Sequence, residues 1–463
     1  MTDSHATFRR AALRDRSPEA APPRQQQPAL RVLIVSYAFP PTGGAGVQRV
    51  LKLVKYLPAY GVVPSVLTVK NPSVPVFDES LKRELAGSID VVRARSLEPS
   101  YRMKSAAWRA NAGSNRTRRW LTGFGKQLLV PDAQVLWQPG AQSALVKRLI
   151  GAGADVVLIS GPPFSQFLLG PVARALGAAV VFDYRDEWST YRKTYEMSSQ
   201  LAARAGDWLE PTLLRSAEVV TTATDAFRAE LLSRFRFLDP QRVHAIPNGY
   251  DPEDFPASLP EPPTDRFVVT YAGTVFRLTS ARNLIGALRR LHEREPELAE
   301  LMELRFAGRI VDTELDYFRD SEKLGVRQLG YVDHARALEL LAESHLVLCL
   351  LDSVPGAERI YPAKIFELMH LGRPCLTLAP AGALRTLVEE HRAGEVVEPR
   401  NEPAIAEALE RRLRAFRGGK VEASAAVGIE RYDRRALAGR FAEILQEAKA
   451  RLRAKRPGLN APQ

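Results

Sequence analysis

The sequence predicts an α/β protein built from two doubly wound parallel-sheet domains. Short apolar segments alternate along the chain with segments of helical periodicity, which is the order expected when helices cover a parallel sheet. Some of these segments, such as "ADVVLIS", are apolar throughout, as strands covered on both faces must be. A proline-rich segment interrupts the alternation once, at residues 246–266. The 463 residues exceed one ordinary core and fit two domains.

The first domain is expected over residues 29–245. It follows an N-terminal tail, residues 1–28, whose Pro, Gln and Arg content predicts disorder. Residues 47–60 carry Val and Leu at helical spacing and predict a helix between the first two strands. The strands of this domain are predicted at residues 31–36, 63–69, 155–160, 179–184 and 218–223.

Residues 246–266 predict an interdomain linker because they are crowded with prolines. The second domain is expected over residues 267–430. Its strands are predicted at residues 267–273, 303–308, 326–330, 346–351, 374–379 and 395–398. A final helix-like segment, residues 431–455, has a periodicity that does not say where it packs. Residues 456–463 are expected to form a second disordered tail.

Composition narrows the class of protein. The cysteines are Cys349 and Cys375, both inside apolar runs, which excludes a disulfide framework and predicts a reducing cytoplasm. The N-terminus lacks the apolar stretch of a signal peptide, and no apolar run is long enough to cross a bilayer. We therefore expect a cytoplasmic protein that is soluble or lies on a membrane surface.

The net charge of +12 is concentrated in two segments, residues 101–131 and 449–463, neither of which contains an acid. Charge alone is compatible with nucleic-acid binding. However, no helix-turn-helix, zinc-finger or aromatic RNA-binding motif is present, so we expect no nucleic-acid partner.

Residues 101–126 combine seven cations with four aromatic side chains. Basic residues near acidic lipid and aromatic rings at the headgroup level favour an anionic membrane surface as partner. The alternative is a solvated loop, which the Asn, Gly and Ser residues at 111–115 favour. The side chains concerned are Arg102, Lys104, Arg109, Arg116, Arg118, Arg119, Lys126, Tyr101, Trp108, Trp120 and Phe124.

The segment "PPTGGAG" follows the first predicted strand and contains Gly43, Gly44 and Gly46. Ligands of open parallel sheets bind beyond the strand ends, where free N–H groups and helix N-termini attract phosphate. The segment is not the GxGxxG dinucleotide fingerprint. Packing of a tight turn explains these glycines about as well as phosphate binding does.

A helix is predicted after Pro362 and before Gly372, with Lys364 in its first turn and Glu367 three residues later. One interpretation is a surface Lys–Glu pair. The intervening apolar residues predict a largely buried helix, however, in which an inward-facing charged pair is costly unless it binds something. We therefore favour a binding site for this pair.

At this point several ordered motifs carry a resemblance over residues 30–455. The chain resembles glycosyltransferase family 4, which has the GT-B fold of two facing Rossmann-like domains with an interdomain cleft, in particular its Pro-x-Lys-x-Phe-Glu subgroup. The motifs are "PPTGGAGVQR", "DVVLISGPPFSQFLLG", "VVFDYRDEW", "VHAIPNGYDPEDF", "YAGTVFR" with "FAGR", and "PAKIFELMHLGRP". In the resembled fold the C-terminal helix packs back on the N-terminal domain.

The resemblance implies that a nucleotide-diphosphate sugar binds mainly to the second domain. Glu367 would bind the ribose hydroxyls, and Lys364 with Arg277 or Arg282 would neutralise the diphosphate. The other implied positions are Gly382 at the helix beneath the diphosphate, Gly43, Gly44 and Gly46 facing it from the first domain, and Asp186 near the reacting sugar.

One departure concerns the E-x7-E pattern of the family. Arg359 stands where the pattern has its first Glu, and Glu358 is one position off. The subgroup named above often lacks that Glu. The departure leaves open which group steadies the donor sugar at its reacting face, with Glu358 as the neighbouring carboxylate.

The resemblance implies a glycosyltransferase that retains anomeric configuration and acts on a lipid-linked or cell-envelope glycan acceptor. No cofactor and no metal are expected, because no DxD-type carboxylate pair is visible. The departing phosphate would take the acceptor's proton, so His244, His334, His345 and His370 are expected to be structural or exposed. The alternatives are a sugar-nucleotide epimerase of the same fold and a non-catalytic sugar-nucleotide-binding scaffold.

Overall fold

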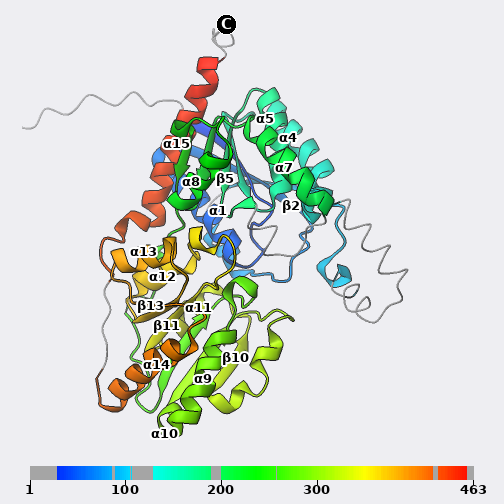
Figure 1. Ribbon diagram of the computed structural model, residues 1–463. Helices are drawn as coiled ribbons and strands as arrows, with labels where there is room; N and C mark the ends of the chain where they lie inside the picture. Colours follow the sequence, from blue (N-terminus) through cyan, green and yellow to red (C-terminus); the bar gives the residue numbers. More distant parts are fainter. Residues whose placement is uncertain are drawn as a thin grey trace, which may run out of the picture.

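The computed structural model describes residues 29–85, 89–104, 106, 129–188, 200–256, 258–420 and 426–455. The predicted tails at 1–28 and 456–463 lie outside the described residues, as does most of the basic segment 101–126. Figure 1 shows two domains stacked along the molecule, the N-terminal one above and the C-terminal one below.

The N-terminal domain contains a seven-stranded parallel sheet with the order β3-β2-β1-β4-β5-β6-β7. The strands are β1 Leu30–Val35, β2 Val62–Val69, β3 Asp90–Ala94, β4 Val156–Gly161, β5 Ala179–Tyr184, β6 Val219–Thr222 and β7 Val243–Ala245. Its main helices are α1 Ala45–Tyr56, α4 Gln138–Gly151, α5 Leu169–Ala175, α7 Gln200–Leu214 and α8 Asp225–Arg234. Strands occur at each of the five positions that the sequence predicts.

The edge strands β3 and β7 were not predicted. β3 contains Asp90 and Arg93 and is only partly covered, and β7 has three residues. Edge strands do not need apolar side chains on both faces, so the uninterrupted apolar run that marks the central strands is missing here.

The C-terminal domain contains a six-stranded parallel sheet with the order β10-β9-β8-β11-β12-β13. The strands are β8 Phe267–Ala272, β9 Met302–Ala307, β10 Val326–Gly330, β11 Leu346–Leu350, β12 Cys375–Leu378 and β13 Glu395–Val397. The helices are α9 Arg282–Arg294, α10 Pro296–Ala299, α11 His334–Ala342, α12 Lys364–Leu371, α13 Ala383–Glu390 and α14 Glu402–Arg417. The two domains therefore share the α/β class, and both are doubly wound around a parallel sheet, as the sequence predicts.

The last helix, α15 (Arg434–Lys455), returns from the C-terminal domain and packs along the N-terminal one, as the red helix in Figure 1 shows. Leu437, Phe441 and Leu445 on α15 are buried in one apolar cluster with Val32 and Ile34 of β1. Each such side chain contributes about 1.5–3 kcal/mol when it is removed from water. Apolar burial thus fixes this helix to the first domain.

The chain crosses between the domains twice, and the two crossing segments lie side by side. The amide of Tyr250 donates to the carbonyl of Tyr432 (3.1 Å), and the amide of Arg434 donates to the carbonyl of Tyr250 (2.9 Å). A Cβ on Gly249 would lie 2.0 Å from the carbonyl oxygen of Tyr432, so the close approach requires glycine. These two segments form the hinge of the molecule.

Charged groups of α1 hold the linker at this hinge. Asp251, which is 2% exposed, accepts hydrogen bonds from Lys55 (2.8 Å) and Tyr56 (2.7 Å) and lies 2.8 Å from the ammonium of Lys52. Lys52 also pairs with Asp254. Since Asp251 and Asp254 belong to the segment "NGYDPED", this motif anchors the linker to the first domain.

Candidate active site at the domain boundary

The carboxyl ends of both sheets contribute to the domain boundary. The chain reverses its direction of winding between β1 and β4 in one sheet and between β8 and β11 in the other, and such points bind ligands in open parallel sheets. Contacts across the boundary include Tyr331 Oη to Asp78 Oδ2 (3.2 Å), Arg359 Nη2 to Glu187 Oε2 (2.9 Å) and Thr224 Oγ1 to the Arg359 carbonyl (2.7 Å). The candidate site lies among these loops.

The glycine loop, residues 43–46, joins β1 to α1. Gly44 has a φ of +99°, a conformation that glycine adopts without strain, and precedes the first residue of α1. A Cβ on Gly43 would lie 2.8 Å from Val76 and 2.9 Å from the hydroxyl of Tyr331, which belongs to the other domain. The bare backbone therefore serves both the turn and the close approach of the two domains.

Arg185 links the ends of β4 and β5 to the first turn of α1. Its guanidinium donates to the carbonyls of Gly46, the second residue of α1, and of Pro162, after β4, and Nε lies 3.3 Å from the carbonyl of Gly161. Arg185 itself follows β5. The arginine fixes the backbone that carries the next residue, Asp186.

Asp186 lies at the end of β5 with its surface open to solvent. Among the residues that the structure describes, no side chain donates a hydrogen bond to its carboxylate. Neighbouring protein atoms partly desolvate the carboxyl group and raise the pKa of Asp186, while the charges of Arg185 and Arg49 act in the opposite direction. A carboxyl group with these properties can accept a hydrogen bond from a ligand hydroxyl.

Asp183, three residues earlier, has a structural role. It is fully buried and accepts hydrogen bonds from Arg49 Nη2 (2.8 Å), Ser160 (2.7 Å) and Thr221 (2.7 Å). Burial opposes its ionisation, but the charge of Arg49 and these hydrogen bonds outweigh burial and lower the pKa of Asp183. Arg49 also donates to the carbonyl of Ile246 (2.9 Å), so the pair joins α1, β5 and the linker.

Arg359, the residue at the position of the missing Glu, contacts the N-terminal domain. Its Nη2 and Nε lie 2.9 and 3.0 Å from Oε2 of Glu187, which is 5% exposed, and it also pairs with its neighbour Glu358. Oε2 of Glu358 accepts the amide of Gly356 (3.0 Å). Glu187, which follows Asp186 in the sequence, is therefore paired with Arg359 of the other domain.

Lys364 is the first residue of α12 and reaches the carboxyl end of β8. Its ammonium donates to the carbonyl of Ala272 (2.6 Å) and lies 3.8 Å from the ring centroid of Tyr271. A Cβ on Gly273, whose φ is +145°, would lie 2.1 Å from this ammonium. The glycine after β8 thus makes room for the lysine at the strand end.

Glu367 does not pair with Lys364. Its Oε1 lies 3.1 Å from Nε2 of His334, the first residue of α11. Burial opposes the charge on both groups, but their mutual attraction outweighs it: the pKa of Glu367 is lowered and that of His334 is raised to about 9. The two groups form an ion pair at neutral pH.

The remaining predicted residues flank these groups. Gly382 precedes α13 with a φ of +148°, and a Cβ there would lie 2.4 Å from the carbonyl oxygen of Glu358. Arg277 and Arg282 are exposed after β8. The guanidinium of Arg282 lies 5.5 Å from the ring centroid of Tyr317, so this arginine packs on the turn beside α9.

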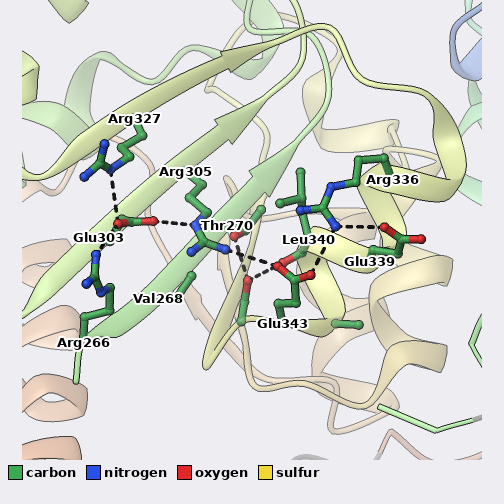
Figure 2. A network of polar contacts seen from close by, with 12 residues as sticks. Arg266, Val268, Thr270, Glu303, Arg305, Arg327, Arg336, Glu339, Leu340 and Glu343 are labelled. Atoms are coloured by element: carbon green, nitrogen blue, oxygen red, sulfur yellow. Dashed lines mark hydrogen bonds and ion pairs between the residues drawn. The ribbon is translucent and has the colours of Figure 1, made fainter. Parts of the chain in front are cut away.

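A second charged cluster lies toward the amino ends of β9 and β10, away from this site (Figure 2). Glu303 faces Arg266 (3.1 Å), Arg305 (2.6 Å) and Arg327 (3.2 Å). Burial of Glu303 is outweighed by hydrogen bonds from these arginines, which lower its pKa. Because the arginines are matched by a carboxylate, we assign this cluster to the stability of the sheet.

Neither a membrane span nor a metal-ligand cluster occurs in the described part of the chain. None of its helices is both long and apolar enough to cross a bilayer. Across the same residues, no three His, Cys, Asp or Glu side chains gather at a distance suited to one metal ion.

Arg185, Glu187 and His334 are not among the site residues that the sequence predicts. His334, which the sequence predicts to be structural or exposed, forms an ion pair with Glu367. Arg185 and Glu187 flank Asp186 within the motif "DYRDEW", and this adjacency was the one signal that could have indicated them. For His334, 33 residues from Glu367, the sequence offers no such signal.

Comparison with known proteins agrees with this architecture. Residues 43–249 match the model of the glycosyl transferase 4-like domain, and residues 266–415 match the model of glycosyl transferases group 1. A D-inositol 3-phosphate glycosyltransferase from Stackebrandtia nassauensis is 27% identical over 216 residues. That match covers 44% of this chain and 47% of the relative, less than half of its length.

Solved structures share the fold at low sequence identity. Anabaena HepE, in complex with UDP and glucose, superposes with a TM-score of 0.57 and 17% identity, covering 90% of this chain and 99% of HepE. The UDP-GlcNAc 2-epimerase from Neisseria meningitidis, bound to UDP-GlcNAc, gives a TM-score of 0.53 and 13% identity, covering 90% of this chain and all of that one (100%). The two matched models follow each other along the chain and correspond to its two parallel-sheet domains. This protein therefore belongs to the glycosyltransferases of the family 4 and group 1 type and has the GT-B fold.

Proposed function

We propose that this glycosyltransferase transfers a sugar from a nucleotide-diphosphate sugar to an acceptor with retention of configuration. The observation that carries the proposal is the position of Lys364 and Glu367. Both lie on α12, with Lys364 at the carboxyl end of β8, where the sheet reverses its winding. A cation and an ionised carboxylate on one helix suit a diphosphate and a ribose, respectively.

The donor would lie between the domains. Glu367 would accept hydrogen bonds from the ribose hydroxyls, and Lys364 would offset the charge of the diphosphate together with the N-terminus of α13 at Gly382. Arg277 or Arg282 would add positive charge from the loop after β8. The glycine loop, residues 43–46, would bring its backbone and the N-terminus of α1 toward the diphosphate from the first domain.

The transfer breaks the bond between the anomeric carbon and the diphosphate oxygen, and the acceptor oxygen bonds to the same face of that carbon. The acceptor's proton passes to the departing phosphate, so no separate base is required. Asp186 would bind a hydroxyl of the reacting sugar or acceptor. Its exposed carboxylate after the end of β5 supports this role.

Uridine nucleotides are the first donors to test. HepE was solved with UDP and glucose, and the epimerase was solved with UDP-GlcNAc. Thermal denaturation of the purified protein with UDP-, GDP- and ADP-sugars identifies the donor, because a ligand at a hundredfold excess over Kd stabilises by about 2.7 kcal/mol.

Turnover then distinguishes the candidate activities. Release of free nucleoside diphosphate together with a glycosylated acceptor supports the transferase. An epimerised donor formed without acceptor would identify an epimerase instead. Donor binding without turnover across the acceptors tested would identify a binding scaffold.

We further propose a lipid-linked or cell-envelope glycan as acceptor and an anionic membrane surface as partner, through residues 101–126. Most of this segment lies outside the described residues. Of its seven cations, Lys104 pairs with the buried Glu98 (2.7 Å) and is not available to lipid. The five cations from Arg109 to Lys126, at about 1 kcal/mol each near anionic lipid, still support reversible binding.

A further inference from the structure

Glu367 is surrounded by cations from three elements. His334 of α11 contacts Oε1 of Glu367 at 3.1 Å. Lys364, which lies with Glu367 on α12, and Arg434 of α15 are close enough for their charges to act on the carboxylate. Among the described residues, no group donates a hydrogen bond to the second carboxylate oxygen, Oε2. The carboxylate is therefore held by one oxygen and open at the other.

Arg434, one of the cations near Glu367, belongs to a crossing segment at the hinge. It is 7% exposed, its amide bonds to Tyr250 in the crossing segment, and within the described chain its guanidinium has no hydrogen-bond partner. Burial and the nearby charge of Arg49 lower its pKa to about 10, and Glu367 acts against this effect. The negative charge of Glu367 therefore offsets part of the cost of burying the charge of Arg434.

His334 contacts Glu367 and also feels charges from the hinge. Besides Glu367, the charges that act on its imidazole are Asp254 of the linker and Lys52 of α1, which pair with each other. Since Glu367, Asp254 and Lys52 come from α12, the linker and α1, respectively, the cluster spans both domains.

We propose that His334 is a positioning residue of the donor site, which orients the Glu367 carboxylate toward the ribose. This inference rests on the proposed function. His334 fixes Oε1 and leaves Oε2 for a ribose hydroxyl. A carboxylate fixed in this way loses less side-chain freedom when the ribose binds, which increases affinity.

A His–Glu pair that only stabilises the fold would not change the affinity for the nucleotide. The test therefore measures nucleotide affinity as a function of pH. The probes are UDP, GDP and ADP, titrated calorimetrically from pH 7 to 10 into the full chain and its variants. His334→Gln removes the charge, and His334→Lys keeps a cation whose ordinary pKa is about 10.4. Glu367→Gln is the control without the carboxylate.

We expect the wild-type affinity for the nucleotide to be constant to about pH 8 and to fall about tenfold as the pH passes about 9, where His334 loses its proton. His334→Gln should bind about tenfold more weakly at pH 7 and show no fall in this range. His334→Lys should restore affinity at pH 7 and move the fall to higher pH. Should His334→Gln not fold, the shifted profile of His334→Lys decides the question.

Equal affinity and the same pH profile in wild type and His334→Gln would overturn the inference. A fall at high pH that both proteins share would come from titration of the nucleobase and would not support a role of His334. Tighter binding by His334→Gln would also overturn it, because His334 would then compete with the ribose. If the wild-type chain binds none of the three nucleotides, the proposed function itself fails. If it binds a nucleotide but His334→Gln binds equally well, only the inference about His334 fails.

Discussion

Arg359 of the C-terminal domain donates to one carboxylate oxygen of Glu187 in the N-terminal domain, through Nη2 at 2.9 Å and Nε at 3.0 Å. Its carbonyl also accepts the hydroxyl of Thr224 at 2.7 Å. The residue that departs from the family pattern is therefore part of a contact between the domains, and its partner Glu187 follows Asp186 in the sequence.

We expect Arg359→Ala to lower the free energy of unfolding by about 1–3 kcal/mol, because it removes a charged hydrogen bond from a buried carboxylate. Urea denaturation measures the change. Glu358→Ala, at a more exposed carboxylate, should cost less than about 1 kcal/mol. The double variant Arg359→Ala with Glu187→Gln should cost less than the sum of its parts; additive effects would show that the pair is not coupled.

Lys364→Ala should lower kcat by about a hundredfold to a thousandfold, the cost of losing one group that stabilises developing charge, while the protein stays folded. Steady-state kinetics with circular dichroism as the folding control measures this. Arg282→Ala tests one of the two candidate arginines: because Arg282 packs over Tyr317, we expect an effect under tenfold, which would assign the added positive charge to Arg277. A near-normal kcat for Lys364→Ala would remove this lysine from the site.

Glu367→Gln should weaken nucleotide binding more than Glu358→Gln or Arg359→Ala does. Glu367 is ionised and has one oxygen open, whereas the oxygens of Glu358 are taken up by Arg359 and the amide of Gly356. Calorimetric titration with the donor nucleotide gives the three affinities. If Glu358→Gln is the most damaging change, the assignment of α12 as the ribose-binding helix is wrong.

The stability of the protein should also depend on the His334–Glu367 pair in a defined pH window. The pKa of His334 is raised to about 9, so its contribution is complete below its ordinary value of 6.5 and is lost as the pH rises through about 9. Wild type should exceed His334→Gln in free energy of unfolding at pH 6 by about 1.5–3 kcal/mol, and the two should converge by about pH 10. Urea denaturation at both pH values tests this; a constant difference would contradict it.

Transfer should persist in EDTA, because Lys364 and the N-terminus of α13 are proposed to supply the positive charge for the leaving diphosphate. The measurement is the rate of nucleotide release before and after chelation. Loss of activity that magnesium or manganese restores would contradict this part of the mechanism.

Vesicles of phosphatidylglycerol test the membrane proposal. Wild type should sediment with them at low salt, and a variant with Arg116, Arg118 and Arg119 changed to Ser should sediment less, because each lost cation removes about 1 kcal/mol of attraction. Equal sedimentation of the two proteins would disprove the role of this segment.

The sequence by itself predicted the central strands and their order along the chain. Buried central strands such as β4 and β5 are apolar throughout, and α12 ends at Gly372, whose φ is +72°, as the glycine predicts. Lys364 and Glu367 could be singled out because their surroundings on one helix are local in sequence. These features depend on the backbone and on neighbours within a few residues, which a sequence displays directly.

Only the tertiary structure decided which charges meet. Glu367 pairs with His334, 33 residues away, and Arg359 pairs with Glu187, 172 residues away. Neither pairing follows from spacing or composition, because a charged side chain selects its partner by distance in the folded chain. The sequence therefore singles out candidate groups such as Lys364 and Glu367, and the packing of the folded chain determines which charges they meet.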